Sequence, residues 1–212
     1  MRLPALIAVL GIAMACGMAP NPTDTPAWVG TVPHALQLKK VDEGSTYMRD
    51  LAQQLPPDSR LTASMDRWQT PDGEVLTESV FRGGSKEELE LALANRHPPP
   101  GNEIGYEEVD ATHWEAHLLE STVQLDENAI ARAAIANDPA TGRELVRLDF
   151  TPAASRKFGD LTAAMVGHKL AVVVDGTIVS APIIESAIKG GAAQITFASA
   201  TEANAFVASI TP

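Results

Sequence analysis

The stretch Leu170–Gly191, LAVVVDGTIVSAPIIESAIKGG, decides the fold of the second half of this chain. Two apolar runs flank Asp175-Gly176, a strong signal for a two-residue hairpin turn because both turn positions need positive φ. Pro182 has no amide hydrogen to donate to a strand ladder, so it must lie at a sheet edge or a bulge. The pair Gly190-Gly191 permits a sharp backbone turn before the next apolar run. The stretch therefore predicts a two-stranded hairpin.

Nothing in this hairpin is suited to catalysis. Ser180-Ala181-Pro182 lacks the G-x-S-x-G elbow that exposes a nucleophilic serine. The nearest histidine, His168, lies on the far side of an apolar strand and has no evident acid partner. We therefore expect no catalytic residue and no enzyme activity.

Metal binding is not expected either. His113 and His117 flank Trp114-Glu115-Ala116, but the spacing differs from H-E-x-x-H and the segment is expected to be a strand, which would separate the two rings. We expect these histidines to be partly exposed polar residues and expect no metal or other cofactor. The acidic clusters Asp42-Glu43, Asp72-Gly73 and Glu107-Glu108-Asp110 are interpreted as solvated faces.

The composition is that of a globular protein with an acidic surface. The chain has 212 residues, of which 45% are hydrophobic, and a net charge of −11. Binding to nucleic acid is not expected, because a basic face is needed to displace counterions from phosphates. The same charge disfavours adsorption to anionic lipid.

The N-terminus is typical of an export signal. Met1-Arg2 is followed by a run of about 13 apolar residues, which suits a signal-peptide core and is shorter than the roughly 20 residues of a membrane span. Residues 1–15 are predicted to be a signal peptide, because Ala13-Met14-Ala15 forms a small-x-small cleavage pattern. The chain's single cysteine, Cys16, comes next.

This arrangement resembles a bacterial lipobox, in which the cysteine becomes the lipidated N-terminus. The resemblance implies a protein held on the periplasmic face of a bacterial membrane only through Cys16. Gly17 favours the outer membrane if the cell is Gram-negative. A plain secretory signal and a retained anchor are the alternatives. Residues 16–33 are rich in Pro, Gly and Thr and are interpreted as a flexible tether.

Two units are predicted after the tether, at residues 34–111 and 112–212. Each contains strands and helices, so the predicted fold class is α+β, with two small α/β-sandwich units. The first unit follows the order β-α-β-β-α-β of a ferredoxin-like fold. Its first helix is expected to be capped by Ser45, and its second by Ser85 in a capping box with Glu88. In the second unit, Thr151-Pro152 starts a helix and the hairpin follows it.

The second unit resembles the P1 head subdomain of SecD, an accessory subunit of the bacterial Sec translocon. The resemblance spans about residues 115–210 and rests mainly on the hairpin stretch. The shared residues are Gly167, Leu170, Ala171, Val174, Asp175, Gly176, Ser180, Ala181, Pro182, Ile188, Gly190 and Gly191.

The resemblance implies an extracytoplasmic module that binds unfolded or translocating polypeptide, or proteins of the translocon or envelope. Extended chain would pair with its strand edges. The residues implied are those of the hairpin region, namely Asp175, Gly176, Ser180, Ala181, Pro182, Gly190 and Gly191. An envelope interaction module that reuses the head fold without a role in secretion is the alternative.

Overall fold

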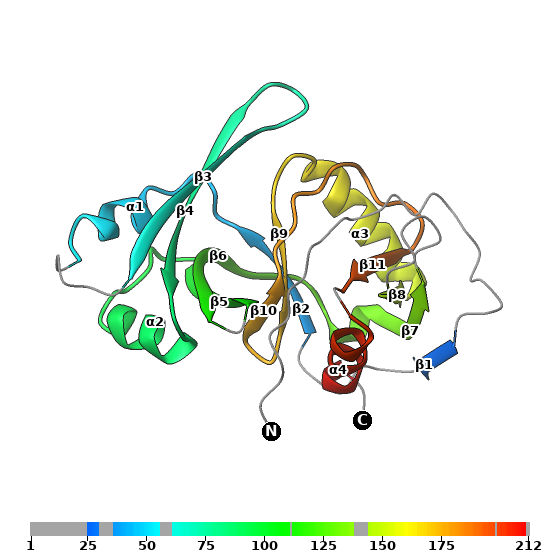
Figure 1. The fold of residues 1–212 in the computed structure, drawn as a ribbon. Coiled ribbons are helices and arrows are strands. Elements are labelled where there is room, and N and C mark those ends of the chain that lie inside the picture. The colour runs from blue at the N-terminus through cyan, green and yellow to red at the C-terminus, as the bar shows by residue number, and fades with distance from the viewer. Residues whose placement is uncertain are drawn as a thin grey trace.

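The computed structural model describes residues 25–29, 36–55, 61–110, 112–137, 144–197 and 199–210. Within these ranges it contains eleven strands, four α-helices and one short 3-10 helix, η1 (Figure 1). The strands are β1 (Thr25–Val29), β2 (Leu36–Val41), β3 (Thr62–Gln69), β4 (Val75–Gly83), β5 (Asn102–Asp110), β6 (His113–Asp126), β7 (Ile130–Asn137), β8 (Glu144–Phe150), β9 (Leu170–Val174), β10 (Thr177–Ser180) and β11 (Ala192–Thr196). The helices are α1 (Tyr47–Ala52), α2 (Lys86–Leu93), η1 (Glu127–Ala129), α3 (Pro152–Ala164) and α4 (Ala200–Ile210).

The larger sheet has seven strands in the order β2-β9-β10-β5-β6-β4-β3. Because β2 pairs with β6 as well as with β9, five of these strands close into a ring, while β4 and β3 extend beyond it. The long strand β6 makes this possible: its first half pairs with β5 and β4, and its second half pairs with β2.

The interior of the ring is filled by a small apolar cluster. Val41, Leu119 and Ile178 belong to it, together with Ala171 and Val173. On β5 the matching position is glycine, since a Cβ on Gly105 would lie 2.6 Å from Leu119 Cδ1 and 2.7 Å from Ile178 Cδ1. A closed sheet of few strands has room inside only for side chains.

The smaller sheet has the order β1-β7-β8-β11. Its strands and helices α3 and α4 pack against the outside of the ring, and a large apolar core fills the space between them. That core joins Leu36 and Leu170 of the ring to Val146 and Leu148 of β8 and to Phe158 of α3. At the other end of the molecule, α1 and α2 cover β4, β5 and β6 (Figure 1).

The α+β class is confirmed, but the ferredoxin-like βαββαβ arrangement is not. The hairpin β9–β10, expected in the second unit, lies in the sheet built by the N-terminal strands. The expected boundary after residue 111 falls between β5 and β6, which pair from Asn102↔Glu120 to Asp110↔His113. The physical reason is that β2 finds its partners in β9 and β6, which are remote in sequence.

The predicted helix caps agree with the structure better than the predicted sheet arrangement does. Ser85 accepts a hydrogen bond from the amide of Glu88, and the Glu88 carboxylate accepts one from the amide of Gly84. Thr151 caps α3, with Pro152 at its first position. The N-cap of α1 is Thr46, one residue later than predicted and without a side-chain cap bond, but Ser45 Oγ does accept a hydrogen bond from the amide of Tyr47, the first residue of α1.

Candidate functional site

The hairpin turn has the predicted geometry. Asp175 and Gly176 have φ values of 47° and 77°, and β9 and β10 pair antiparallel from Thr177↔Val174 onward. Both turn residues are exposed. The turn is therefore a surface feature that sets the register of two buried strands.

Beyond the turn, the sequence-predicted residues separate into different environments. Ser180 is 2% exposed and follows a register shift in β10. Ala181 packs against the apolar cluster in the ring. The carbonyl of Pro182 accepts a hydrogen bond from the amide of Leu170. The burial of Ser180 makes it unsuited to attack a substrate from solvent.

The paired glycines lie at the start of β11. Gly191 has a φ of 73°, and its carbonyl accepts a hydrogen bond from the amide of Phe150. A Cβ on Gly191 would lie 3.1 Å from Ser155 Oγ. Gly190 is exposed. The pair thus allows the tight entry to β11 that the sequence predicts.

An apolar pocket lies between the ring and the smaller sheet. Its lining includes Leu38 and Val172 from the ring, Phe158 from α3, Pro182 and Ile188 from the segment after the hairpin, and Ala193 from β11. Among the described residues of its lining, Gln194 is the one that is polar. Of the hairpin-region residues predicted from the sequence, Pro182 alone is in that lining.

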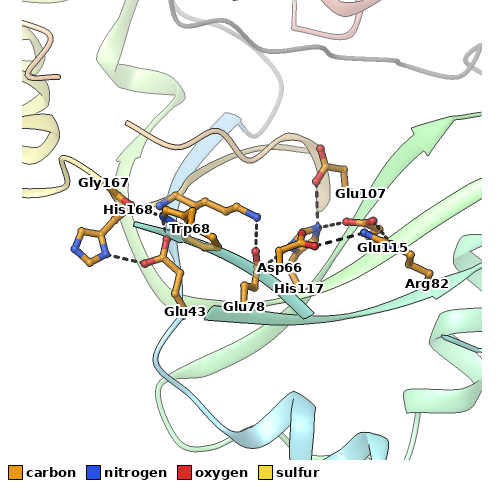
Figure 2. A network of polar contacts seen from close by, with 11 residues as sticks. Glu43, Asp66, Trp68, Glu78, Arg82, Glu107, Glu115, His117, Gly167 and His168 are labelled. Atoms are coloured by element: carbon orange, nitrogen blue, oxygen red, sulfur yellow. Dashed lines mark hydrogen bonds and ion pairs between the residues drawn. The ribbon is translucent and has the colours of Figure 1, made fainter. Parts of the chain in front are cut away.

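A buried charge cluster lies at one end of the ring, beside β3 and β4 (Figure 2). Glu78 on β4 is 2% exposed and His117 on β6 is also 2% exposed. One Glu78 oxygen is 2.6 Å from His117 Nδ1, and the other accepts a hydrogen bond from Lys169 Nζ. His117 Nε2 is 3.1 Å from Glu107 Oε2.

The cluster continues on either side of this centre. Glu115 lies 3.6 Å from His117 and is bonded by Arg82 at 2.6 Å. At the other end, Glu43 is 6% exposed and accepts hydrogen bonds from the backbone amide of Lys169 and from His168. The prediction that Glu43 lies on a solvated face is therefore wrong. The prediction that His117 is partly exposed is also wrong, because its side chain is buried. In contrast His113 is exposed, 2.8 Å from Asp110.

These contacts fasten the hairpin β3–β4 to the segment that precedes β9. Trp68 Nε1 donates a hydrogen bond of 2.8 Å to the carbonyl of Gly167, and the Lys169 ammonium lies 4.9 Å from the centre of the Trp68 ring. Glu78 completes the attachment through Lys169. The hairpin β3–β4, at the top of Figure 1, is thus held by polar contacts in the half nearest its turn.

The charges in the cluster are mutually stabilised. Burial alone lowers the pKa of His117, but the carboxylates of Glu107 and Glu78 outweigh burial and raise it to about 10. Burial alone raises the pKa of Glu78, but His117 and Lys169 outweigh it and lower it to about 2. Burial raises the pKa of Glu43. His117 is therefore a cation at neutral pH, held by Glu78.

The free energy of unfolding should consequently fall as the pH rises from about 6.5 to about 10. A histidine whose folded pKa is raised stabilises the protein fully below its unfolded pKa, and this contribution is lost as the pH passes its folded pKa. Urea unfolding at several pH values measures this slope. A His117→Gln variant should show a shallower slope, and the exposed His97→Gln control the wild-type slope. Identical slopes for His117→Gln and wild type would contradict the assignment.

One pattern in the sequence pointed to the cluster. Glu78 alternates with Leu76 and Val80 on one face of β4, and all three are buried. A carboxylate on an otherwise apolar strand face needs a partner.

In the described part of the chain no group of three or more His, Cys, Asp or Glu residues is placed to hold a metal ion, and Cys16 lies outside that part.

Two packed sheets, the larger of which closes five strands into a ring, and helices on both ends define a mixed α+β protein. The family model of the SecDF P1 head subdomain matches residues 103–211, more than half of the chain. The chain therefore belongs to the SecDF P1 head subdomain family. This confirms the resemblance drawn from the hairpin stretch.

The curated relatives are translocase subunits. The chain is 28% identical to the protein translocase subunit SecD of Acidaminococcus fermentans over 205 residues, which cover 92% of this chain and 45% of that protein. It is 34% identical to SecD of Thermobaculum terrenum over 110 residues, covering 52% of this chain and 21% of that protein. The chain thus spans less than half the length of these curated relatives.

A solved structure of SecDF, described as a membrane component that enhances protein export, is also similar. The TM-score is 0.45 and the identity 27%, covering 85% of this chain and 62% of that chain. Across the ranges that the structure describes, no helix is both long enough and apolar enough to cross a membrane.

Proposed function

We propose that this chain is a non-enzymatic, extracytoplasmic module that binds extended polypeptide during protein export or maturation. The observation that carries the proposal is the apolar pocket between the two sheets, formed within a fold of the SecDF P1 head family. The pocket has a volume of about 40 Å³, which admits the tip of an aliphatic side chain, and each CH₂ group buried there contributes about 0.8 kcal/mol. An unfolded chain exposes side chains of this kind.

Family membership supports the role in export. The relatives are translocase subunits, and SecDF is described as enhancing export. The proposed partners are therefore unfolded or translocating polypeptide and proteins of the translocon or envelope. The segments proposed to reach the membrane, a signal peptide at residues 1–15, lipidated Cys16 and a tether to residue 33, lie largely outside the described residues. Residues 25–29 form β1, which pairs with β7.

Binding should depend on the pocket. We expect Ala193→Phe to weaken peptide binding about tenfold, because the new ring fills space that a peptide side chain would enter and about 1.4 kcal/mol corresponds to tenfold. Ala193 lines the pocket and is partly exposed, so the ring can be accommodated. The measurement is fluorescence anisotropy of labelled, unstructured peptides with a central Leu, titrated with the full chain in detergent.

Two controls complete this test. Ala163→Phe places the same ring on an exposed position of α3, and its affinity should equal that of the wild type. A peptide with a central Ser should bind weakly to both. Absence of saturable binding to the wild type, or equal affinity of Ala193→Phe and wild type, would contradict the proposed function.

A further inference from the structure

Strand β3 forms an open edge of the seven-stranded sheet. It is the last strand in the sheet order, and among the strands that the structure describes it pairs only with β4. The pairing runs without a register shift from Thr62↔Arg82 to Gln69↔Val75. A regular edge of this length presents a continuous row of backbone groups.

The register fixes which backbone groups point outward. The amide of Thr70 bonds to the carbonyl of Glu74, and in an antiparallel ladder hydrogen-bonded and non-bonded pairs alternate. Even-numbered residues of β3 therefore bond to β4. The odd-numbered residues direct their N–H and C=O groups to the free edge, and these are Ala63, Met65, Arg67 and Gln69.

All four of these residues are exposed, whereas Ser64, Asp66 and Trp68 are half-buried. The surface beside this edge also carries exposed apolar side chains. Met65 of β3 is 56% exposed, and Val75 of β4, on the same face of the sheet, is 47% exposed. Natural edges are often blocked by charged side chains, especially lysine, by proline, by a bulge or by short length. β3 contains no proline or lysine, Arg67 is the one charged residue among its four outward positions, and its pairing is regular.

We propose that the open edge of β3 binds an extended polypeptide segment by strand addition. This inference rests on the proposed function and names a second contact surface for the same class of ligand. The occupant is a neutral or cationic segment rather than a second copy of this chain, because two copies would each bring a net charge of −11. Backbone pairing accepts many sequences, while side-chain pockets select among them.

This surface is distinct from the apolar pocket. The pocket is lined by residues of β2, β7, β8, β9, β11 and α3 and of the segment after β10, and no residue of β3 or β4 is among them. The ion pair of Glu78 with Lys169 and the hydrogen bond from Trp68 to the carbonyl of Gly167 hold β4 and β3 in place. The edge is therefore ordered before a peptide binds. Little conformational entropy of this protein is lost on binding, which favours affinity.

Hydrogen exchange on the full chain tests the proposal without any substitution. With a saturating unstructured peptide, the amides of Ala63, Met65 and Arg67 should exchange at least about tenfold more slowly, since each gains a hydrogen bond. The amides of Ser64 and Asp66 should change less, since they already bond to β4. Binding without protection of the odd-numbered amides would overturn the proposal.

A pair of substitutions tests the same point by affinity. Met65→Pro removes an outward amide and no hydrogen bond to β4, and proline is tolerated on such an edge. We expect it to weaken peptide binding at least about fivefold. Met65→Thr removes the apolar side chain but keeps the amide, and should retain most of the affinity. Equal weakening by both variants would overturn strand addition, and Arg67→Pro repeats the test if Met65→Pro does not fold.

The outcomes separate this inference from the proposed function. If Ala193→Phe weakens binding while the β3 amides remain unprotected and Met65→Pro binds normally, the pocket alone binds peptide and the edge proposal fails. If the β3 amides are protected but Ala193→Phe binds peptide normally, the edge proposal is supported and the proposed role of the pocket is contradicted. Protection without peptide that grows with protein concentration would show a second copy at the edge and overturn the proposal.

Discussion

Replacing Glu78 with glutamine is expected to lower the free energy of unfolding by about 3–5 kcal/mol, because it leaves buried cations without their counter-charge. His117 bonds to one Glu78 oxygen and Lys169 to the other, and Glu78 is 2% exposed. A glutamine fills the same space and keeps one acceptor, so the loss reports charge rather than volume. Urea unfolding of the full chain at pH 7 measures it.

Glu90→Gln is the matched control. Glu90 lies 3.9 Å from Lys86 on α2, and its side chain is 50% exposed. Removing an exposed ion pair of this kind costs about 0–1 kcal/mol. Similar losses for Glu78→Gln and Glu90→Gln would mean that the cluster is solvated and that the buried ion pair does not form.

The cluster also explains how the hairpin β3–β4 is oriented. A buried ion pair gives little net stability compared with a well-packed apolar pair of the same volume. Its partners here come from β4, β6 and the residue before β9, which meet only in the folded chain. We infer that the cluster chiefly specifies where the hairpin lies, and so where the β3 edge faces.

The features predicted correctly are those set by residues close together in the sequence. Asp175-Gly176 defines its turn through the positive φ of both residues, and Thr151 caps α3 through an amide three residues away. The order β-α-β-β-α-β predicted for residues 34–111 matches the order of β2, α1, β3, β4, α2 and β5 along the chain. These signals lie within a few residues, where steric and hydrogen-bonding rules act directly.

What the sequence did not predict depends on pairings between distant segments. Glu43 meets His168 across 125 positions, and Lys169 meets Glu78 across 91. The closure of the ring likewise joins β2 to β9. An alternating pattern predicts which face of a strand is buried but not which strand lies beside it. The division into residues 34–111 and 112–212 therefore did not anticipate the pairing of β2 with β6 and β9.

Gly167→Ala is expected to lower the free energy of unfolding by about 2–4 kcal/mol, through backbone strain and overlap together. Gly167 has a φ of 88°. A Cβ there would lie 2.6 Å from Thr70 Cγ2 and 3.1 Å from Thr70 Cα. Because the backbone of Thr70 must move as well as its side chain, rotation about χ1 cannot relieve the overlap.

Gly101→Ala separates the two causes. Gly101 has nearly the same φ, 90°, and a Cβ there meets nothing within 4 Å. It should therefore show only the conformational cost of about 1 kcal/mol, and the difference between the two variants measures the contact of Gly167 with Thr70. Equal losses would mean that the β3–β4 hairpin does not rest on Gly167. A larger loss at Gly167 would show that its close contact with Thr70 holds the hairpin β3–β4 against the segment before β9.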